Sequence, residues 1–203
     1  MADGIKIEIF KQKNADELTR AFADPTSKLE TGSAAAVTAA LSAALFARAA
    51  SLTQREQTGH ERVNYIVRNA EILRNYMVHL IDEDVNSRGP LRRAMKEGKA
   101  LEIEAAREPA VAICGEIINM MAQALGLMKE LCPLCPKDAL HYVGEAAELA
   151  MAAIRSARLF IVNLSDKSTD ETYRFVVRRE NEITLNACIV LENEILAAVE
   201  AAI

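Results

Sequence analysis

The stretch that decides the fold is LETGSAAAVTAALSAALFARAASLT, at residues 29–53. It begins with a Gly-Ser step at Gly32 and Ser33 and continues as a run dominated by alanine. Alanine has the highest helix propensity but a small side chain, so the run predicts a helix over 32–54 that buries little surface of its own. Such a helix allows close approach, either by another helix or by a ligand.

The composition favours helices throughout. The chain has 203 residues, of which 51% are hydrophobic and only 4% aromatic. An aliphatic, alanine-rich core suits helices better than sheets, so we expect an all-α fold. The length fits one domain, and we assign residues 1–203 to a single helical domain.

Charge and patterning argue against several classes of partner. The net charge is −5, whereas nucleic-acid binders usually carry a basic face. Polar residues at Thr38, Ser42 and Arg48 interrupt the alanine run, which argues against a membrane span. The N-terminal sequence MADGIKIEIF lacks the apolar segment of a signal peptide, and four cysteines without such a signal favour free thiols. We expect a cytoplasmic protein that binds neither nucleic acid nor membrane.

Apolar residues recur three and four positions apart along most of the chain, which is the spacing of one helix face. A short helix over 16–22 starts from Asn14, with Glu17 completing a capping box. The alternating sequence IKIEIF at 5–10 predicts a brief strand. The other predicted helices cover 32–54, the segment between 58–61 and Gly89, 103–131, 136–164, and the segment from 168–171 to the C-terminus.

Local signals set the helix boundaries. The sequences TGHE at 58–61 and STDE at 168–171 read as capping boxes that start helices. Gly89 and Pro90 end one helix, and Pro109 either kinks the next one or marks its start.

Sustained apolar stripes predict long helices that cross at about 20°. Several helices carry two stripes, so each has neighbours on two sides. We therefore expect a bundle of five to six long helices. Its apolar faces exceed what one chain of this length covers, which predicts a homodimer or a larger self-assembly.

The first candidate for chemistry is Asp84, which closes the acidic sequence DED at 82–84. It continues the apolar stripe that includes Met77 and Leu80, so helical spacing places it on a buried face. A buried carboxylate needs a partner or has a raised pKa, and either makes it a candidate proton carrier. From the stripe alone we favour the other interpretation, a helix-end Asp that turns outward or pairs with Arg88 one turn on.

Two other features carry polar or reactive groups. Cys132 and Cys135 have the spacing of half a zinc site, but no second pair or histidine cluster completes it. We expect incidental thiols and no metal site, with a structural metal or a reversible disulfide as the alternative. Asn163 lies on an apolar stripe beside Phe160, so a buried amide there binds either a ligand or the backbone of a neighbouring helix.

Four segments follow one another in the order of a known family. They are TGSAAAVTAALSAALFARAASLT at 31–53, LIDEDVNSRGPLRRAMK at 80–96, AAREPAVAICGEIINMMAQAL at 105–125 and DALHYVGEAAELAMAAIRSARLFIVNL at 138–164. Over roughly residues 14–200 the chain resembles the cyclodeaminase, or methenyltetrahydrofolate cyclohydrolase, domain of the formiminotransferase-cyclodeaminase family. The resemblance implies an all-α homodimer that binds tetrahydrofolate derivatives in a cleft near the dimer interface, with no cofactor besides the folate substrate.

The resemblance also assigns roles residue by residue. Gly32 and Ser33 match the end of the family's glycine turn, and Asn163 matches its Asn-Leu step, so these three are implied in substrate binding. Asp84 matches the last acid of the family's Asp-Glu-Asp element and is the implied proton carrier. Tyr142 stands where the family has the aspartate of its Asp-Val-Gly step, and we take it as the second catalytic candidate.

The family's chemistry sets what the site needs. Cyclohydrolase chemistry adds water to the methenyl carbon, and cyclodeamination joins N10 to a formimino carbon and expels ammonia. Both need a group that moves a proton and rigid placement of the flat pterin. The carboxylate tail of a folate needs cations; we assign Lys28 and Arg92, with Arg93 and Arg155 also available. Glu30 and Thr31 replace two glycines of the family's turn.

Three functions follow from these observations. The first is an enzyme that interconverts one-carbon folates by cyclohydrolase or cyclodeaminase chemistry. The second is a divergent paralogue that binds a folate or another small molecule without this catalysis. The third is a non-catalytic helical interaction protein.

Overall fold

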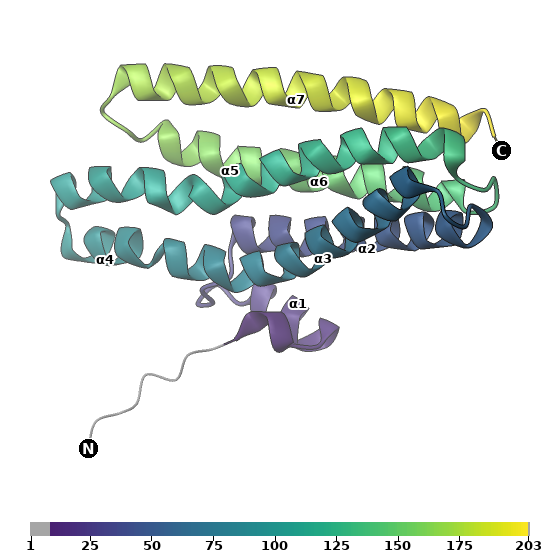
Figure 1. The fold of residues 1–203 in the computed structure, drawn as a ribbon. Coiled ribbons are helices and arrows are strands. Elements are labelled where there is room, and N and C mark those ends of the chain that lie inside the picture. The colour runs from purple at the N-terminus through teal and green to yellow at the C-terminus, as the bar shows by residue number, and fades with distance from the viewer. Residues whose placement is uncertain (1–8, 203) are drawn as a thin grey trace.

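The computed structural model describes residues 9–202, which form seven α-helices and two short 3₁₀ helices and contain no strand (Figure 1). The elements are η1 (Phe10–Gln12), α1 (Ala15–Ala23), α2 (Thr31–Glu56), α3 (Glu61–Ser87), α4 (Gly89–Glu97), α5 (Ala100–Leu131), η2 (Cys132–Leu134), α6 (Leu140–Ser165) and α7 (Glu171–Glu200). The five long helices run along one another, with α7 on one side and α1 on the other. The predicted all-α bundle is confirmed, and the strand predicted over 5–10 falls mostly outside the described residues.

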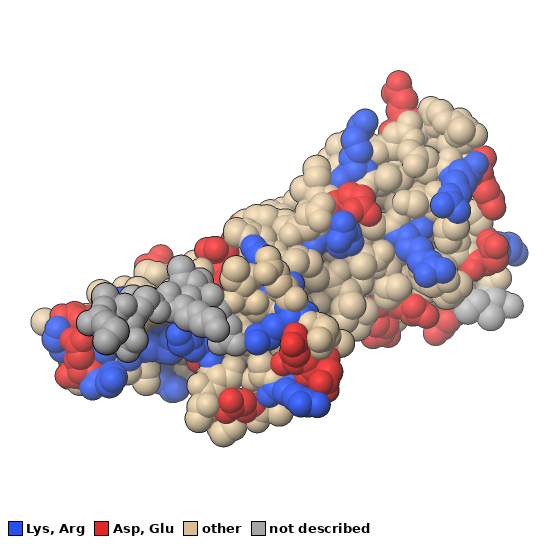
Figure 2. All heavy atoms as spheres, turned by 90° about the horizontal axis from the view of Figure 1, so that it is seen from below, with Lys and Arg blue, Asp and Glu red and all other residues tan. Residues whose placement is uncertain are grey.

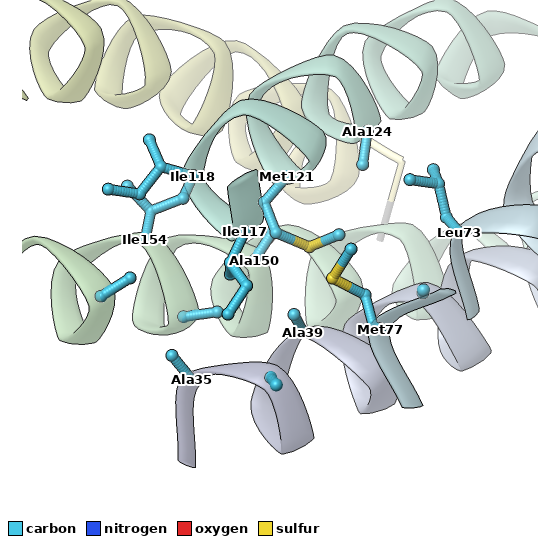
Figure 3. Packing of buried hydrophobic residues seen from close by; sticks show 14 of the residues in the cluster. Ala35, Ala39, Leu73, Met77, Ile117, Ile118, Met121, Ala124, Ala150 and Ile154 are labelled. Carbon is cyan, nitrogen blue, oxygen red and sulfur yellow. The ribbon is translucent and has the colours of Figure 1, made fainter. Parts of the chain in front are cut away.

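The alanine-rich helix α2 packs mainly against α3 and α6, and it also contacts α5. The fully buried alanines of α2 are Ala35, Ala36, Ala39, Ala43, Ala49 and Ala50. Figure 3 shows Ala39 close to Met77 of α3 and Ala150 of α6. The Ser42 hydroxyl donates a hydrogen bond of 2.7 Å to the backbone oxygen of Ala146, which ties α2 to α6. The groups that approach the alanine run are therefore neighbouring helices.

The capping prediction is confirmed for α1 and corrected for α7. The Asn14 side chain accepts from the Glu17 N–H while the Glu17 carboxylate accepts from the Asn14 N–H. For α7 the N-cap is Asp170, whose carboxylate accepts from the Tyr173 N–H at 3.0 Å. Ser168 is not the cap because its hydroxyl already accepts from the Asp170 N–H, outside the helix.

The start of α3 also differs from the prediction. Gly59 has φ of +83°, a left-handed conformation that a helix cannot continue through. Thr58 therefore cannot cap a helix, and the N-cap is His60, whose Nδ1 accepts from the Val63 N–H at 3.3 Å. An imidazole nitrogen replaces the predicted hydroxyl.

The structure shows where three prolines lie relative to the helix boundaries. Gly89 and Pro90 begin α4 rather than merely ending α3, because a proline fits the first turn of a helix, where its missing N–H is not needed. Pro109 lies inside the continuous helix α5 and does not mark its start. Pro136 opens a turn, closed by a 3.0 Å hydrogen bond from the Ala139 N–H to its carbonyl, so α6 begins at Leu140 instead of Pro136.

Two helical runs, Thr31–Glu56 and Ala100–Leu134, are long and apolar enough to cross a membrane by length and composition alone. A large share of each apolar window is buried inside the bundle. Core helices of soluble proteins show the same property, so the two runs are weak evidence for a membrane protein.

The close packing of α2 makes a size-dependent prediction. Ala39→Leu adds three carbons at a position with no exposed surface, and overpacking of this kind costs roughly 1–3 kcal/mol. Ala112→Leu makes the same change at an exposed position of α5 and should leave stability within about 0.5 kcal/mol of the parent. Urea denaturation measures both free energies of unfolding, and equal values for the two variants would contradict the packing described here.

Candidate functional site

Asp84 lies at the C-terminal end of α3 with none of its surface exposed, as its place on the apolar stripe predicts. Its Oδ2 accepts two hydrogen bonds, from the Ser33 hydroxyl at 2.7 Å and from the Arg88 Nη2 at 2.6 Å. A buried carboxylate is tolerated only when it is paired and hydrogen-bonded, and these two partners supply that pairing. The start of α2 and the end of α3 are thus joined through one carboxylate.

Gly32 allows this carboxylate to come close. A Cβ at position 32 would lie 2.0 Å from the Asp84 Oδ1, well inside van der Waals contact. Gly32 is helical, so the glycine is required by the close approach and not by an unusual backbone angle. The group that approaches the Gly-Ser step is therefore a side chain of α3.

Arg88 covers Asp84 and is itself only 2% exposed. Its Nε donates to the Asp84 backbone oxygen at 3.2 Å, and its guanidinium lies 5.3 Å from the centre of the Phe160 ring. Its Nη1 forms an ion pair with Glu30, the residue before α2. Ser33, Asp84, Arg88 and Glu30 form one continuous polar chain from the interior to the surface.

The outer end of this chain opens into a pocket of about 520 Å³ between α4, the start of α5 and the end of α6. Its lining combines apolar and charged side chains. The lining residues are Glu30, Arg88, Leu91, Arg92, Met95, Ile103, Arg107, Phe160, Asn163, Leu164 and Lys167. Figure 2 shows Lys and Arg side chains spread along one face of the molecule, including the end that holds α4, with acidic side chains among them.

The charge of the pocket favours an anionic ligand. Arg88, Arg92, Arg107 and Lys167 supply four cations, and Glu30 is the single carboxylate among the lining residues. Burial lowers the pKa of Arg92 below its ordinary value, and the nearby charge of Arg88 lowers it further. Planar guanidinium groups bind carboxylates and phosphates well, and an aromatic ring gives a flat ligand a surface to stack on.

The sequence-predicted residues lie at different places relative to this pocket. Arg92 and Asn163 line it, and Asn163 is exposed there instead of buried on an apolar stripe as predicted. Gly32 and Ser33 sit behind the lining, where they hold Asp84. Lys28 is exposed and contributes its backbone oxygen, 3.4 Å from the Arg88 Nη2.

Tyr142 lies elsewhere in the chain. The Arg48 guanidinium carbon lies 4.5 Å from the centre of the Tyr142 ring. Arg48 is sixteen residues after Gly32 on α2. At 1.5 Å of rise per residue, this separates Tyr142 from Gly32 by roughly 24 Å along the helix. One chain does not bring Tyr142 and Asp84 to the same site.

Sequence reasoning misses five residues of the pocket as functional groups. The sequence presents Arg88 only as a partner for Asp84, and Glu30 only as a substitution in the glycine turn. Arg107, Phe160 and Lys167 give no signal of their own, because they reach the pocket from α5, α6 and the segment after α6 through packing between elements that lie far apart in sequence.

The pair Cys132 and Cys135 lines a different pocket, of about 580 Å³, near the C-terminal end of α7. Both thiols are free, and the described residues hold no cluster of three His, Cys, Asp or Glu that could bind a metal. Burial raises the pKa of Cys132 to about 11, and it also raises the pKa of Cys135. Since the thiolate is the nucleophile and the metal ligand, these raised pKa values favour the interpretation as unreactive thiols.

A glycine pair tests the contact at Asp84. Gly32→Ala forces the carboxylate away from its partners and should cost roughly 2 kcal/mol or more of the free energy of unfolding. Gly115→Ala is the matched control inside α5, where an added Cβ meets no atom within 4 Å and should stabilise by about 0.5–1 kcal/mol. Urea denaturation gives both values, and a stabilising Gly32→Ala would show that Asp84 does not pack against this residue.

The cysteine pair makes a pH-dependent prediction. With a pKa of about 11, only about one Cys132 thiol in 3,000 is ionised at pH 7.5. Its rate of alkylation by iodoacetamide should therefore rise about tenfold per pH unit between pH 7 and 9, as measured by mass spectrometry. Glutathione serves as the reference thiol. Alkylation at pH 7 as fast as that of glutathione would instead mark a reactive cysteine.

Comparison with known proteins places this chain in a family. Residues 14–182 match the family described as formiminotransferase-cyclodeaminase. No curated protein matches the sequence. Among solved structures, the fold is similar to formiminotetrahydrofolate cyclodeaminase from Thermotoga maritima, with a TM-score of 0.86 and 18% identity over 94% of this chain and 98% of that one. The structural likeness shows the fold, the sequence match covers most of the chain, and the protein therefore belongs to the formiminotransferase-cyclodeaminase family.

Proposed function

We propose that this protein binds a one-carbon derivative of tetrahydrofolate in the pocket between α4, the start of α5 and the end of α6, and acts at the one-carbon bridge of this ligand. The observation that carries the proposal is a cation-lined pocket with an aromatic wall, at Arg88, Arg92, Arg107 and Phe160, in a chain of this family. A folate joins a flat pterin to a carboxylate tail. Phe160 suits the first part and the arginines suit the second.

The proposed reaction is hydrolysis of a methenyl bridge or loss of ammonia from a formimino group, without a cofactor besides the folate. Asp84 is the proposed proton carrier. Its Oδ1 is buried and makes no hydrogen bond to any described residue. Arg88 lies between this carboxylate and the pocket and stays paired with Asp84, so in this proposal a water molecule admitted with the ligand carries the proton between the Asp84 Oδ1 and the ligand. Ser33 holds the other carboxylate oxygen in place meanwhile.

A catalytic role for Tyr142 requires a second copy of the chain, because one chain keeps it far from Asp84. We propose a homodimer in the cytoplasm, as the sequence predicts. Exposed apolar side chains support self-association: Val176, Ile183 and Val190 recur every seven residues along α7 and so share one face of it.

Binding without catalysis is the second candidate function, and Glu30 favours it. Its carboxylate lies between the two arginines that would hold the ligand's anion and adds a negative charge at the mouth of the pocket. In this second function the chain keeps the family's fold and binds a folate or another flat anion without converting it.

Two measurements separate these functions. Titration with 5,10-methenyl- and 5-formyl-tetrahydrofolate should show binding that Arg92→Gln weakens. The fall in methenyl absorbance should then be faster with protein than without it, and Asp84→Asn should slow the catalysed rate by about 100-fold or more, as loss of an acid–base group does.

Controls make the assay specific to the site. Asp138→Asn makes the same chemical change at an exposed position outside the pocket and should keep the parent rate. Tight binding with no catalysed hydrolysis and no ammonia release would establish the non-catalytic function. An unchanged rate in Asp84→Asn would remove Asp84 as the proton carrier, and no binding at millimolar folate would overturn both folate functions, catalytic and non-catalytic.

A further inference from the structure

Glu30 is placed like a helix cap but does not act as one. It is the N-cap residue of α2, with extended backbone angles of φ −142° and ψ −161°, and its side chain makes no capping hydrogen bond. Its Oε2 is instead paired with the Arg88 Nη1, and its Oε1 lies 3.9 Å from the Arg92 Nη1. The side chain is therefore directed to the two arginines of the pocket and not to the helix end.

The two sides of this contact differ in burial. The Arg88 side chain is 2% exposed and is fixed by Asp84 and by the Phe160 ring, whereas the Glu30 side chain is 44% exposed. A half-exposed glutamate can change rotamer into solvent at low cost, while a buried arginine cannot leave its carboxylate without a large penalty. Glu30 is the partner that can move away.

The arginines also retain unused bonding capacity. The Nη1 atoms of Arg88 and Arg92 are buried, and although both are near Glu30, neither makes a hydrogen bond of good geometry with a described residue. Charge-assisted hydrogen bonds to a well-aligned carboxylate or phosphate are much stronger than a misaligned ion pair. An anion entering from the pocket can satisfy both atoms better than Glu30 does.

We propose that Glu30 is an internal competitor for the anionic group of the pocket's ligand, and thereby sets its specificity. In the empty pocket its carboxylate neutralises Arg88 and Arg92. When a ligand binds, the ligand's carboxylate or phosphate takes this place and Glu30 swings into solvent. The pocket then admits only ligands whose anion binds both arginines better than one flexible glutamate. The inference rests on the proposed function only in taking this pocket as the ligand site.

Anion binding to variants tests the proposal without a folate. Isothermal titration with glutarate and, separately, with inorganic phosphate should give a Kd at least tenfold lower for Glu30→Gln than for the parent protein. The glutarate and phosphate arms show which anion the arginines prefer. Glu130→Gln is the matched control, because Glu130 is 47% exposed and pairs with Arg62 away from this pocket.

Additional variants protect the test against misfolding. Glu30→Asp keeps the charge but shortens the side chain, so its Kd should fall between those of the parent and Glu30→Gln. In low-salt buffer Glu30→Gln should melt below the parent, and phosphate should restore its Tm more than it raises that of the parent. Arg107→Gln removes a cation from another wall and should weaken anion binding in either background.

The outcomes separate this inference from the proposed function. An equal or higher Kd for Glu30→Gln than for the parent, or no anion binding by either protein, overturns the competitor role even if the protein converts folates. A tenfold gain in Glu30→Gln together with no folate binding or turnover supports the competitor role and overturns the proposed substrate.

Discussion

The structure depends on one buried carboxylate. The Asp84 carboxylate is buried where α2 begins and α3 ends. A buried carboxylate needs hydrogen-bond donors, and this need determines which residues surround Asp84. Ser33 and Arg88 donate to it, and Gly32 leaves the space it occupies. Removing one partner of such a group is costly because the remaining charge has no access to water. The sequence at all four positions is therefore constrained together.

Arg88 extends this constraint to the surface. Because it must stay over Asp84, its guanidinium forms a fixed wall where α4 departs from α3, and the pocket lies on the other side of that wall. The same side chain thus balances an internal charge and presents a cation to a ligand. Chemistry at the pocket and stability of the helix ends are coupled through it, so the function of a variant at this position has to be interpreted together with its stability.

Much of this arrangement was predictable from local sequence patterns. Helical periodicity placed Asp84 on a buried face, and alanine content predicted a helix that allows close approach, because both signals repeat within one helix. The predicted start of α3 was wrong because Gly59 has a left-handed backbone conformation, which the local capping pattern does not reveal. The pocket walls at Arg107 and Phe160 were not predictable, since they depend on how α5 and α6 pack, which spacing along one helix does not encode.

The alanine run has a consequence for how this fold can diversify. A helix with such short side chains acts as a thin spacer, holding α3 and α6 near its axis and giving the middle of the bundle a core with little tolerance for change. The pocket at Arg88 and the one at Cys132 both lie toward ends of the bundle, where loops and helix termini supply the lining. Substitutions such as Glu30 can therefore alter ligand chemistry at an end while the central spacing of the scaffold stays intact.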